Sequence, residues 1–208
     1  MEIRLTDIGK RYNRQWIFKG INYTISSNSS LALVGNNGSG KSTLLQLIYN
    51  YQTISKGSIS YHLQGRQVND EDLYQFFSFV APYLDLPEEF TLDEVWDFNF
   101  SLKKLKTGIT KSQVFELCGL AGNEKKFIKH FSSGMKQRLK LILALYADTP
   151  ILLLDEPCSN LDKNGILWYR KTIFDMLGSR TILVASNQLD EYDFCAGRIE
   201  MHEFKNFQ

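Results

Sequence analysis

The sequence predicts an α/β fold with a mainly parallel central sheet and a helical insert. Two observations support this fold class. Short apolar runs alternate with helical patterns along most of the chain, and that alternation is typical of parallel sheets. From residue 91 to about residue 118, helical patterns follow one another without a strand, which predicts the insert. The 208 residues provide one core, whereas two full domains would be cramped.

Six segments are expected to be strands because their apolar residues are continuous or alternate with polar ones. They are 17–25, 31–34, 58–63, 76–81, 151–155 and 181–186. In the first strand, Ile17, Ile21, Tyr23 and Ile25 occupy alternate positions and are expected to face the core. Pro82 closes the strand at 76–81.

Helices are expected between these strands. Thr91 with Glu94, and Thr110 with Gln113, have the spacing of capping boxes, in which two side chains satisfy backbone N–H groups reciprocally. Apolar residues at helical spacing follow each pair and also follow residue 43. Beyond the helix after residue 43, the expected helices are 91–105, 110–118, 133–147 and 163–177.

The composition excludes several classes of protein. Lys and Arg number 24 and Asp and Glu 23, without a long run of one sign, so no nucleic-acid partner is expected. Cys118, Cys158 and Cys195 share no metal-ligand spacing and are expected to be buried free thiols of a reducing compartment. The N-terminus lacks the apolar core of a signal peptide, and the most apolar stretch, 139–147, is far shorter than the roughly 20 residues that cross a bilayer. A cytoplasmic location is expected.

The stretch GNNGSGKST lies between the strand at 31–34 and the first helix. Gly35, Gly40, Lys41 and Ser42 match the pattern G-x-x-x-x-G-K-[ST], whose glycines let successive backbone N–H groups converge on a polyphosphate. Its lysine reaches the β and γ phosphates and its hydroxyl holds Mg²⁺. The residues expected to hold the nucleotide here are Gly35, Asn36, Asn37, Gly38, Ser39, Gly40, Lys41, Ser42 and Thr43.

A pair of carboxylates ends the apolar strand at 151–155. Asp155 and Glu156 are placed at the carboxyl end of that strand, where open α/β sheets bind ligands. Asp155 is expected to orient the Mg²⁺ shell together with Ser42. Glu156 is the candidate catalytic residue that orients and polarises the attacking water.

Together these motifs resemble the nucleotide-binding subunits of ATP-binding cassette (ABC) proteins over nearly the whole chain. In that resemblance, 35–42 is the Walker A loop and 151–156 is Walker B. FSSGMKQR at 131–138 looks like the signature sequence, and 159–162 corresponds to the D-loop. The resemblance implies a P-loop NTPase of ABC type. It also implies a single ATP-binding domain over 1–208, with an antiparallel N-terminal β region and a helical insert at about 84–148.

The resemblance also implies partners and further site residues. Two chains form a homodimer, or a heterodimer with another ABC subunit, and share each ATP. Ser132, Ser133 and Gly134 then contact the ATP held by the partner subunit. Tyr12 occupies the position where an aromatic ring stacks on adenine. Trp16 is a competitor for that role, and ordinary packing is the alternative for Tyr12.

The chain departs from the family pattern at three places. Pro82 stands where the Q-loop glutamine is expected, and it has no side-chain oxygen for Mg²⁺; Tyr83 or Asp85 are substitutes to be considered. Asn187 replaces the switch histidine, so it can donate a hydrogen bond to phosphate but cannot accept a proton near neutral pH. In the signature, Ser133 and Met135 replace glycine and glutamine. We expect Mg-dependent ATP hydrolysis by Lys41, Glu156 and Asn187, at a slow rate.

The leading functional expectation is an ATPase subunit that closes as a dimer and drives a separate integral membrane permease from its cytoplasmic face. The aromatic run at 95–102 is either a docking surface for that permease or the buried side of an amphipathic helix. One alternative is a soluble ABC ATPase acting in translation, on DNA or in assembly. Another is a nucleotide-binding regulator with weak hydrolysis.

Overall fold

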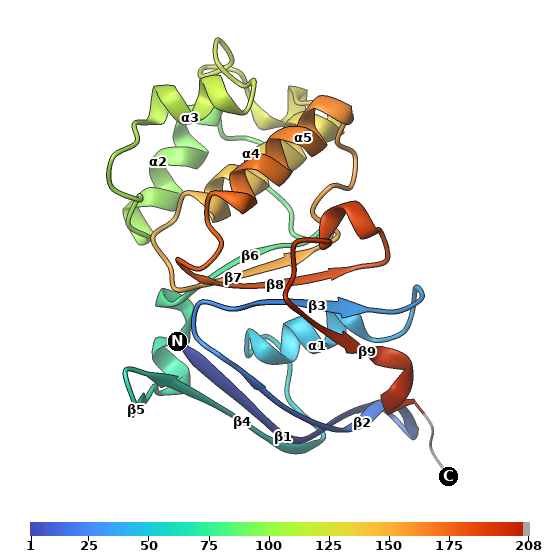
Figure 1. Cartoon of the computed structure of the whole chain (residues 1–208). Helices are drawn as coiled ribbons and strands as arrows, with labels where there is room; N and C mark the ends of the chain where they lie inside the picture. The colour runs from blue at the N-terminus through green and yellow to red at the C-terminus, as the bar shows by residue number, and fades with distance from the viewer. Residues whose placement is uncertain (206–208) are drawn as a thin grey trace.

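A five-stranded parallel sheet in the order β6-β7-β8-β3-β9 forms the centre of the computed structural model, which describes residues 1–205 (Figure 1). Its strands are β3 (Ser30–Val34), β6 (Phe77–Val80), β7 (Ile151–Asp155), β8 (Thr181–Ser186) and β9 (Gly197–Glu200). Since the strands are parallel, the carboxyl ends of β3 and β7 open on the same edge, with β8 between them. The expected mainly parallel sheet is confirmed.

A second, antiparallel sheet is built mostly from the N-terminal quarter of the chain. Its order is β2-β1-β4-β5, with β1 (Glu2–Tyr12), β2 (Gln15–Ile25), β4 (Lys56–Leu63) and β5 (Arg66–Gln67). This agrees with the antiparallel region that the family resemblance implied. The sequence reasoning missed β1, whose pairing with β2 shifts register at three places and whose apolar alternation is broken accordingly.

Helix α1 (Lys41–Ile48) lies between the two sheets, as Figure 1 shows. One face of the parallel sheet packs on α1 and the antiparallel sheet, and the other face packs on the remaining helices. Successive strand residues therefore alternate between the two cores: Leu153 lies in the first and Leu152 and Leu154 in the second. Because both faces are covered, β3, β7 and β8 are buried at every position, which explains their continuous apolar sequences.

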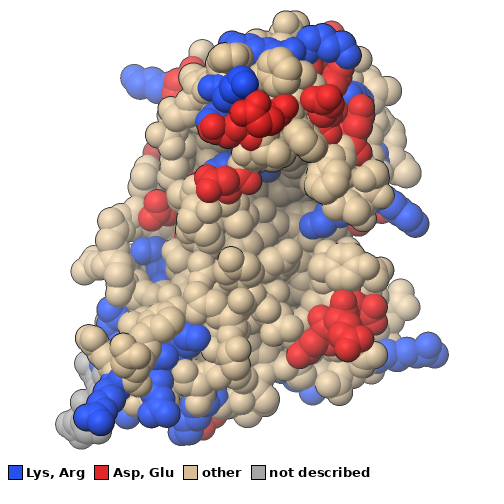
Figure 2. Space-filling view, turned by 180° about the vertical axis from the view of Figure 1, so that it is seen from behind, with Lys and Arg blue, Asp and Glu red and all other residues tan. Residues whose placement is uncertain are grey.

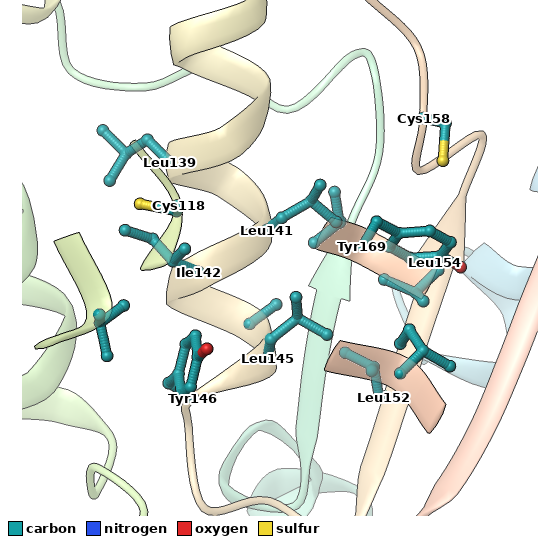
Figure 3. Close-up of a cluster of buried hydrophobic side chains, with 14 of the residues drawn as sticks. Cys118, Leu139, Leu141, Ile142, Leu145, Tyr146, Leu152, Leu154, Cys158 and Tyr169 are labelled. Carbon is teal, nitrogen blue, oxygen red and sulfur yellow. The ribbon is translucent and has the colours of Figure 1, made fainter. Parts of the chain in front are cut away.

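The other face of the parallel sheet is covered by α2 (Leu92–Leu102), α3 (Lys111–Leu117), α4 (Ser133–Leu145) and α5 (Lys163–Phe174) (Figure 1). Both predicted capping boxes are present, at Thr91 and at Thr110. Figure 3 shows Leu141 and Leu145 of α4 on the side of the helix that faces the sheet, where Leu152 and Leu154 lie, whereas Ile142 points the other way, toward Cys118. Helix α4 thus joins the insert to the sheet.

The predicted helices are longer than the observed ones at their C-terminal ends. The segment 91–105 is helical only to Leu102, because Lys103 takes an extended conformation and its ammonium group donates to the carbonyl of Phe77. In β2, Phe18 is fully buried and Ile17 only half-buried, contrary to the expected alternation. The prediction also lacked β9 and four short 3₁₀ segments. These are η1 (Asp70–Gln75), η2 (Ile128–His130), η3 (Leu189–Glu191) and η4 (Met201–Phe204).

Arg180, just before β8, fastens α4 to the sheet. It is 3% exposed, and its guanidinium donates to the carbonyls of Leu145 and Ile151 at 3.2 Å each. It thereby satisfies carbonyls at the C-terminal end of α4 that have no partner within the helix. Burial lowers the pKa of Arg180 to about 10.

Figure 2 shows basic and acidic side chains in separate small groups, with uncharged side chains in the hollow between the helical part and the sheets.

The expected free cysteines are confirmed as buried. Among residues 1–205, no helix has the length and apolar character needed to cross a bilayer.

Replacing Gly57 by Ala is expected to destabilise the fold severely. Gly57 lies in β4 at φ 89°, and an added Cβ would be 2.2 Å from the carbonyl oxygen of Thr6. Gly65, at φ 80° with nothing within 4 Å, is the matched control for the backbone conformation alone. Gly65→Ala should cost about 1 kcal/mol of unfolding free energy, and Gly57→Ala at least ~2 kcal/mol more. Urea denaturation of both variants checks this, and equal losses would contradict it.

Candidate functional site

The loop between β3 and α1 is shaped by its glycines. Gly35, Gly38 and Gly40 have φ values of 148°, 72° and 101°. A Cβ on Gly40 would lie 2.8 Å from the ring of Phe18, and one on Gly35 would lie 2.8 Å from Oγ of Ser39. The loop therefore packs closely against β2 and against its own residue Ser39. Gly40 caps α1 without a side-chain hydrogen bond, so the helix N-terminus offers backbone N–H groups and positive partial charge to an anion.

Lys41 is held over this loop. Its ammonium group donates to the carbonyls of Gly35 at 2.8 Å and Asn36 at 3.3 Å, and the residue is 5% exposed. Burial lowers the pKa of Lys41, and the charges of Glu156 and Asp155 oppose that shift. Backbone carbonyls of the loop thus hold the lysine ammonium group in position over it. Oγ of Ser39 is buried and has no partner within the described chain, as expected of a group that awaits one.

Asp155 ends β7 in a buried position, 1% exposed. Neither of its carboxylate oxygens has a hydrogen-bond partner within 3.5 Å among residues 1–205. Burial raises the pKa of Asp155 to about 6. Ser42 and Lys41 partly oppose that shift, whereas the charge of Glu156 adds to it. A buried carboxylate without a partner is costly, and a cation would compensate it.

Glu156 turns away from the strand. It is a non-glycine residue at φ 44°, and its N–H still donates to the carbonyl of Ala185 in β8 at 2.9 Å. This turn brings Glu156 to a pocket shared with the glycine loop. The residues lining the pocket are Asn37, Gly38, Ser39, Gly40, Lys41, Ser42, Thr43 and Glu156.

The residues present fit a magnesium ion bound together with phosphates. Within the described part of the chain, no group of three or more His, Cys, Asp or Glu could hold a metal ion by itself. Ser42 and the unpartnered Asp155 provide a hydroxyl and a carboxylate, which are hard oxygen ligands. Mg²⁺ commonly binds with one or two protein ligands, water and substrate phosphates.

The structure brings Asn187 to the same site. Its Nδ2 atom donates to Oδ1 of Asn37 at 3.1 Å, which joins the end of β8 to the glycine loop. The two residues are 150 positions apart in the sequence. This contact places Asn187, which the resemblance assigns to the switch position, beside the glycine loop.

Tyr12 and the signature residues are not among the residues lining that pocket. Tyr12 is 45% exposed, and its hydroxyl donates to Oε1 of Gln52 at 2.5 Å. Ser132 caps α4 by accepting from the N–H of Met135 at 3.2 Å. Gly134 lies close to the carbonyl of Asn160, so the N-terminus of α4 is packed against the turn that precedes α5 in its own chain.

Tyr83 and Glu191 also lie near the site. Burial raises the pKa of Tyr83 to about 12; a hydrogen bond with Gln46 opposes that shift, and the charge of Asp155 adds to it. Tyr83, which the sequence reasoning named only as a substitute for the missing glutamine, therefore faces the carboxylate. Glu191 is 1% exposed, and burial raises its pKa. The sequence reasoning missed it because a glutamate in the polar stretch 187–191 has no signal of burial.

Asp155→Asn is expected to stabilise the nucleotide-free protein at neutral pH. The pKa of Asp155 is about 6 in the folded chain, against 3.8 for an unperturbed Asp, so the folded state keeps this proton up to a higher pH than the unfolded state does. The carboxyl therefore costs stability as pH rises through this window, by on the order of 2 kcal/mol between about pH 4 and about pH 7.5. The gain of the Asn variant in urea unfolding should grow as pH rises from about 4 to about 7.5. A gain independent of pH would contradict this.

Comparisons with known proteins agree with this arrangement. The family described as "ABC transporter" matches residues 18–159. The lantibiotic transport ATP-binding protein SrtF of Streptococcus pyogenes is 29% identical over 198 residues, which cover 93% of this chain and 83% of that protein. The sulfate/thiosulfate import ATP-binding protein CysA of Brucella melitensis is 31% identical over 207 residues, 90% of this chain and 55% of that protein.

Solved structures share the fold. A putative ABC transporter ATP-binding protein from Pyrococcus furiosus superposes with a TM-score of 0.81 at 22% identity, over 99% of this chain and 100% of that one. A bacterial Atm1-family ABC exporter solved with ATP bound gives a TM-score of 0.78 at 19% identity, over 96% of this chain and 37% of that one. The family match covers more than half of the residues and includes both the glycine loop and the carboxylate pair. This chain belongs to the ABC transporter family.

Proposed function

We propose that the chain is the ATP-binding and ATP-hydrolysing subunit of an ABC transporter, acting as a dimer on a separate membrane permease. The observation that carries this proposal is the buried Asp155, whose carboxylate has no hydrogen-bond partner within 3.5 Å in the described chain and whose charge acts on Lys41 of the glycine loop. The site thus combines groups for a polyphosphate and for a divalent cation. The similar proteins named above are ATP-binding subunits for transport or import, which supports the same function.

Each residue has a defined task in this proposal. The loop amides of residues 35–43 and Lys41 bind the β and γ phosphates of ATP, and Ser42 and Asp155 hold Mg²⁺. The ion neutralises charge on the phosphate oxygens. Glu156 accepts a hydrogen bond from the attacking water and aligns it with the γ phosphorus, so that ADP and phosphate form. Asn187 donates to a γ-phosphate oxygen once it releases Asn37.

The rest of the ATP site comes from a partner subunit. Ser132, Ser133 and Gly134 lie at the N-terminus of α4, outside the pocket of their own glycine loop. We assign them to the γ phosphate of the ATP bound by the other subunit, where the helix N-terminus favours an anion. Tyr12 is assigned to the adenine ring, for which its hydroxyl has to leave Gln52.

A permease docks, in this proposal, on the hollow beside α2. A pocket there is lined by Ser78, Phe79, Val80, Leu84, Asp85, Leu86, Asn99, Lys103, Lys140, Leu143 and Ala144. On α2, Trp96 is buried, but Phe98 and Leu102 are 57% and 68% exposed, so the run at 95–102 serves both the core and the surface. Docking there places the subunit on the cytoplasmic face of the membrane.

Glu156→Gln is expected to stop turnover while leaving ATP binding intact. Glutamine keeps the size of the side chain but cannot polarise water, and the loss should be ~100-fold or more in kcat. Mg-ATP affinity, measured by calorimetry, should change little. Lys41→Ala is the control, and it should lose affinity itself. Unchanged turnover in the Gln variant would remove the assigned role of Glu156.

Asn187→His is expected to raise kcat by several-fold, on the order of 3 to 10, because histidine adds a group that can take up a proton near neutral pH. The pH profile of kcat should gain an ionisation near about pH 6.5. Asn187→Ala removes the amide donor and should be slower than the unchanged protein. If all three proteins hydrolyse ATP at one rate with one pH profile, Asn187 has no part in the reaction.

A further inference from the structure

The peptide unit between Pro157 and Cys158 is held from both sides by buried side chains. Its carbonyl accepts a hydrogen bond from Nε2 of Gln137 at 2.7 Å. Its N–H donates to Oε1 of Glu191 at 2.9 Å. Gln137 is 4% exposed and Glu191 is 1% exposed, so water cannot replace either partner without opening the core.

The two side chains come from different parts of the site. Gln137 lies in α4, in the first turns after the signature residues. Glu191 lies in η3, four positions after Asn187, and its backbone carbonyl accepts from the hydroxyl of the fully buried Tyr169 at 3.0 Å. A single peptide unit is therefore fastened to the signature helix and to the segment that follows the switch residue.

The carbonyl of Glu156 accepts only a local turn hydrogen bond, from the N–H of Ser159 at 3.1 Å, so among the described residues this peptide unit is the first after the proposed catalytic residue that is bonded to other elements. The N–H of Glu156 completes the β7–β8 ladder, and the chain then turns at φ 44°. Pro157 has no N–H, so the next donor along the chain is the N–H of Cys158. The direction in which the Glu156 side chain leaves the strand is fixed on one side by the ladder and on the other by Gln137 and Glu191.

We propose that Gln137 and Glu191 are positioning residues for hydrolysis, which hold Glu156 in the orientation that aligns the attacking water. The inference rests on the proposed ATPase function. If both side chains act in this way, the orientation of Glu156 depends on the positions of α4 and η3. A displacement of about 1 Å in such a group is enough to cost on the order of 100-fold in rate.

The test compares Glu191→Ala and Gln137→Ala with the conservative Glu191→Gln, which keeps an oxygen acceptor for the N–H of Cys158. Both alanine variants should lose ~10-fold or more in kcat while KM for ATP stays within about threefold, since ground-state binding is untouched. Glu191→Gln should stay within about threefold of the unchanged protein in kcat. The double alanine variant should be no slower than the slower single variant, because both side chains act through one peptide unit.

A second measurement does not depend on catalysis. Hydrogen exchange followed by mass spectrometry should show faster exchange of the Cys158 amide in Glu191→Ala, and not in Glu191→Gln. Thr149→Val is the stability control, because it removes buried hydrogen bonds of Thr149 with Ser78 and Arg180 just before the start of β7. It should lower the melting temperature without lowering kcat at a temperature where the protein is folded.

Three outcomes would overturn the inference. They are an unchanged kcat in both alanine variants, a kcat loss in Thr149→Val as large as theirs, and fully additive losses in the double variant. Lys41→Ala separates this failure from that of the proposed function. If the unchanged protein hydrolyses ATP and Lys41→Ala does not, the ATPase assignment stands whatever Gln137 and Glu191 do.

Discussion

The burial of β3, β7 and β8 on both faces is the constraint on which the rest of the structure depends. Each of these strands is covered by α1 and the antiparallel sheet on one face and by α2–α5 on the other. Residues at their carboxyl ends are consequently held at one edge with little freedom to move. The glycine loop and Asn187 directly follow β3 and β8, and the carboxylate pair spans the end of β7, so a rigid sheet sets their relative positions.

The same burial makes the site electrostatically costly. Lys41 and Asp155 are 5% and 1% exposed. Burial lowers the pKa of Lys41 and raises that of Asp155, so in each case it favours the neutral form. Neither has an ion-pair partner in the described chain, although their charges act on one another. A ligand that carries both signs of charge stabilises the charged forms of both groups. A triphosphate with its divalent ion has that property.

Distant parts of the chain are joined around the site by hydrogen bonds, most of them between a side chain and a backbone group. Gln137 and Glu191 reach one peptide unit, Arg180 joins the end of α4 to β7, and Asn187 contacts the glycine loop. Each bond ties a helix or turn to the carboxyl or amino end of a strand. The helical part and the sheet are thus connected at both ends of β7, and in the proposal above the bond from Gln137 transmits a movement of α4 to Glu156.

The sequence by itself determined the parts of this protein whose signals are local. The continuous strands, both capping boxes, the place of the glycine loop between a strand and a helix and the place of the carboxylate pair at a strand end were predicted correctly. Each depends on neighbouring residues within one turn or one strand. Only the tertiary structure decided the strand order, the burial of Phe18, and the meetings of Asn187 with Asn37 and of Glu191 with Cys158. β1 escaped prediction since its register shifts break the alternation that marks a strand. These features depend on contacts between residues far apart in the chain, which packing selects and no local pattern encodes.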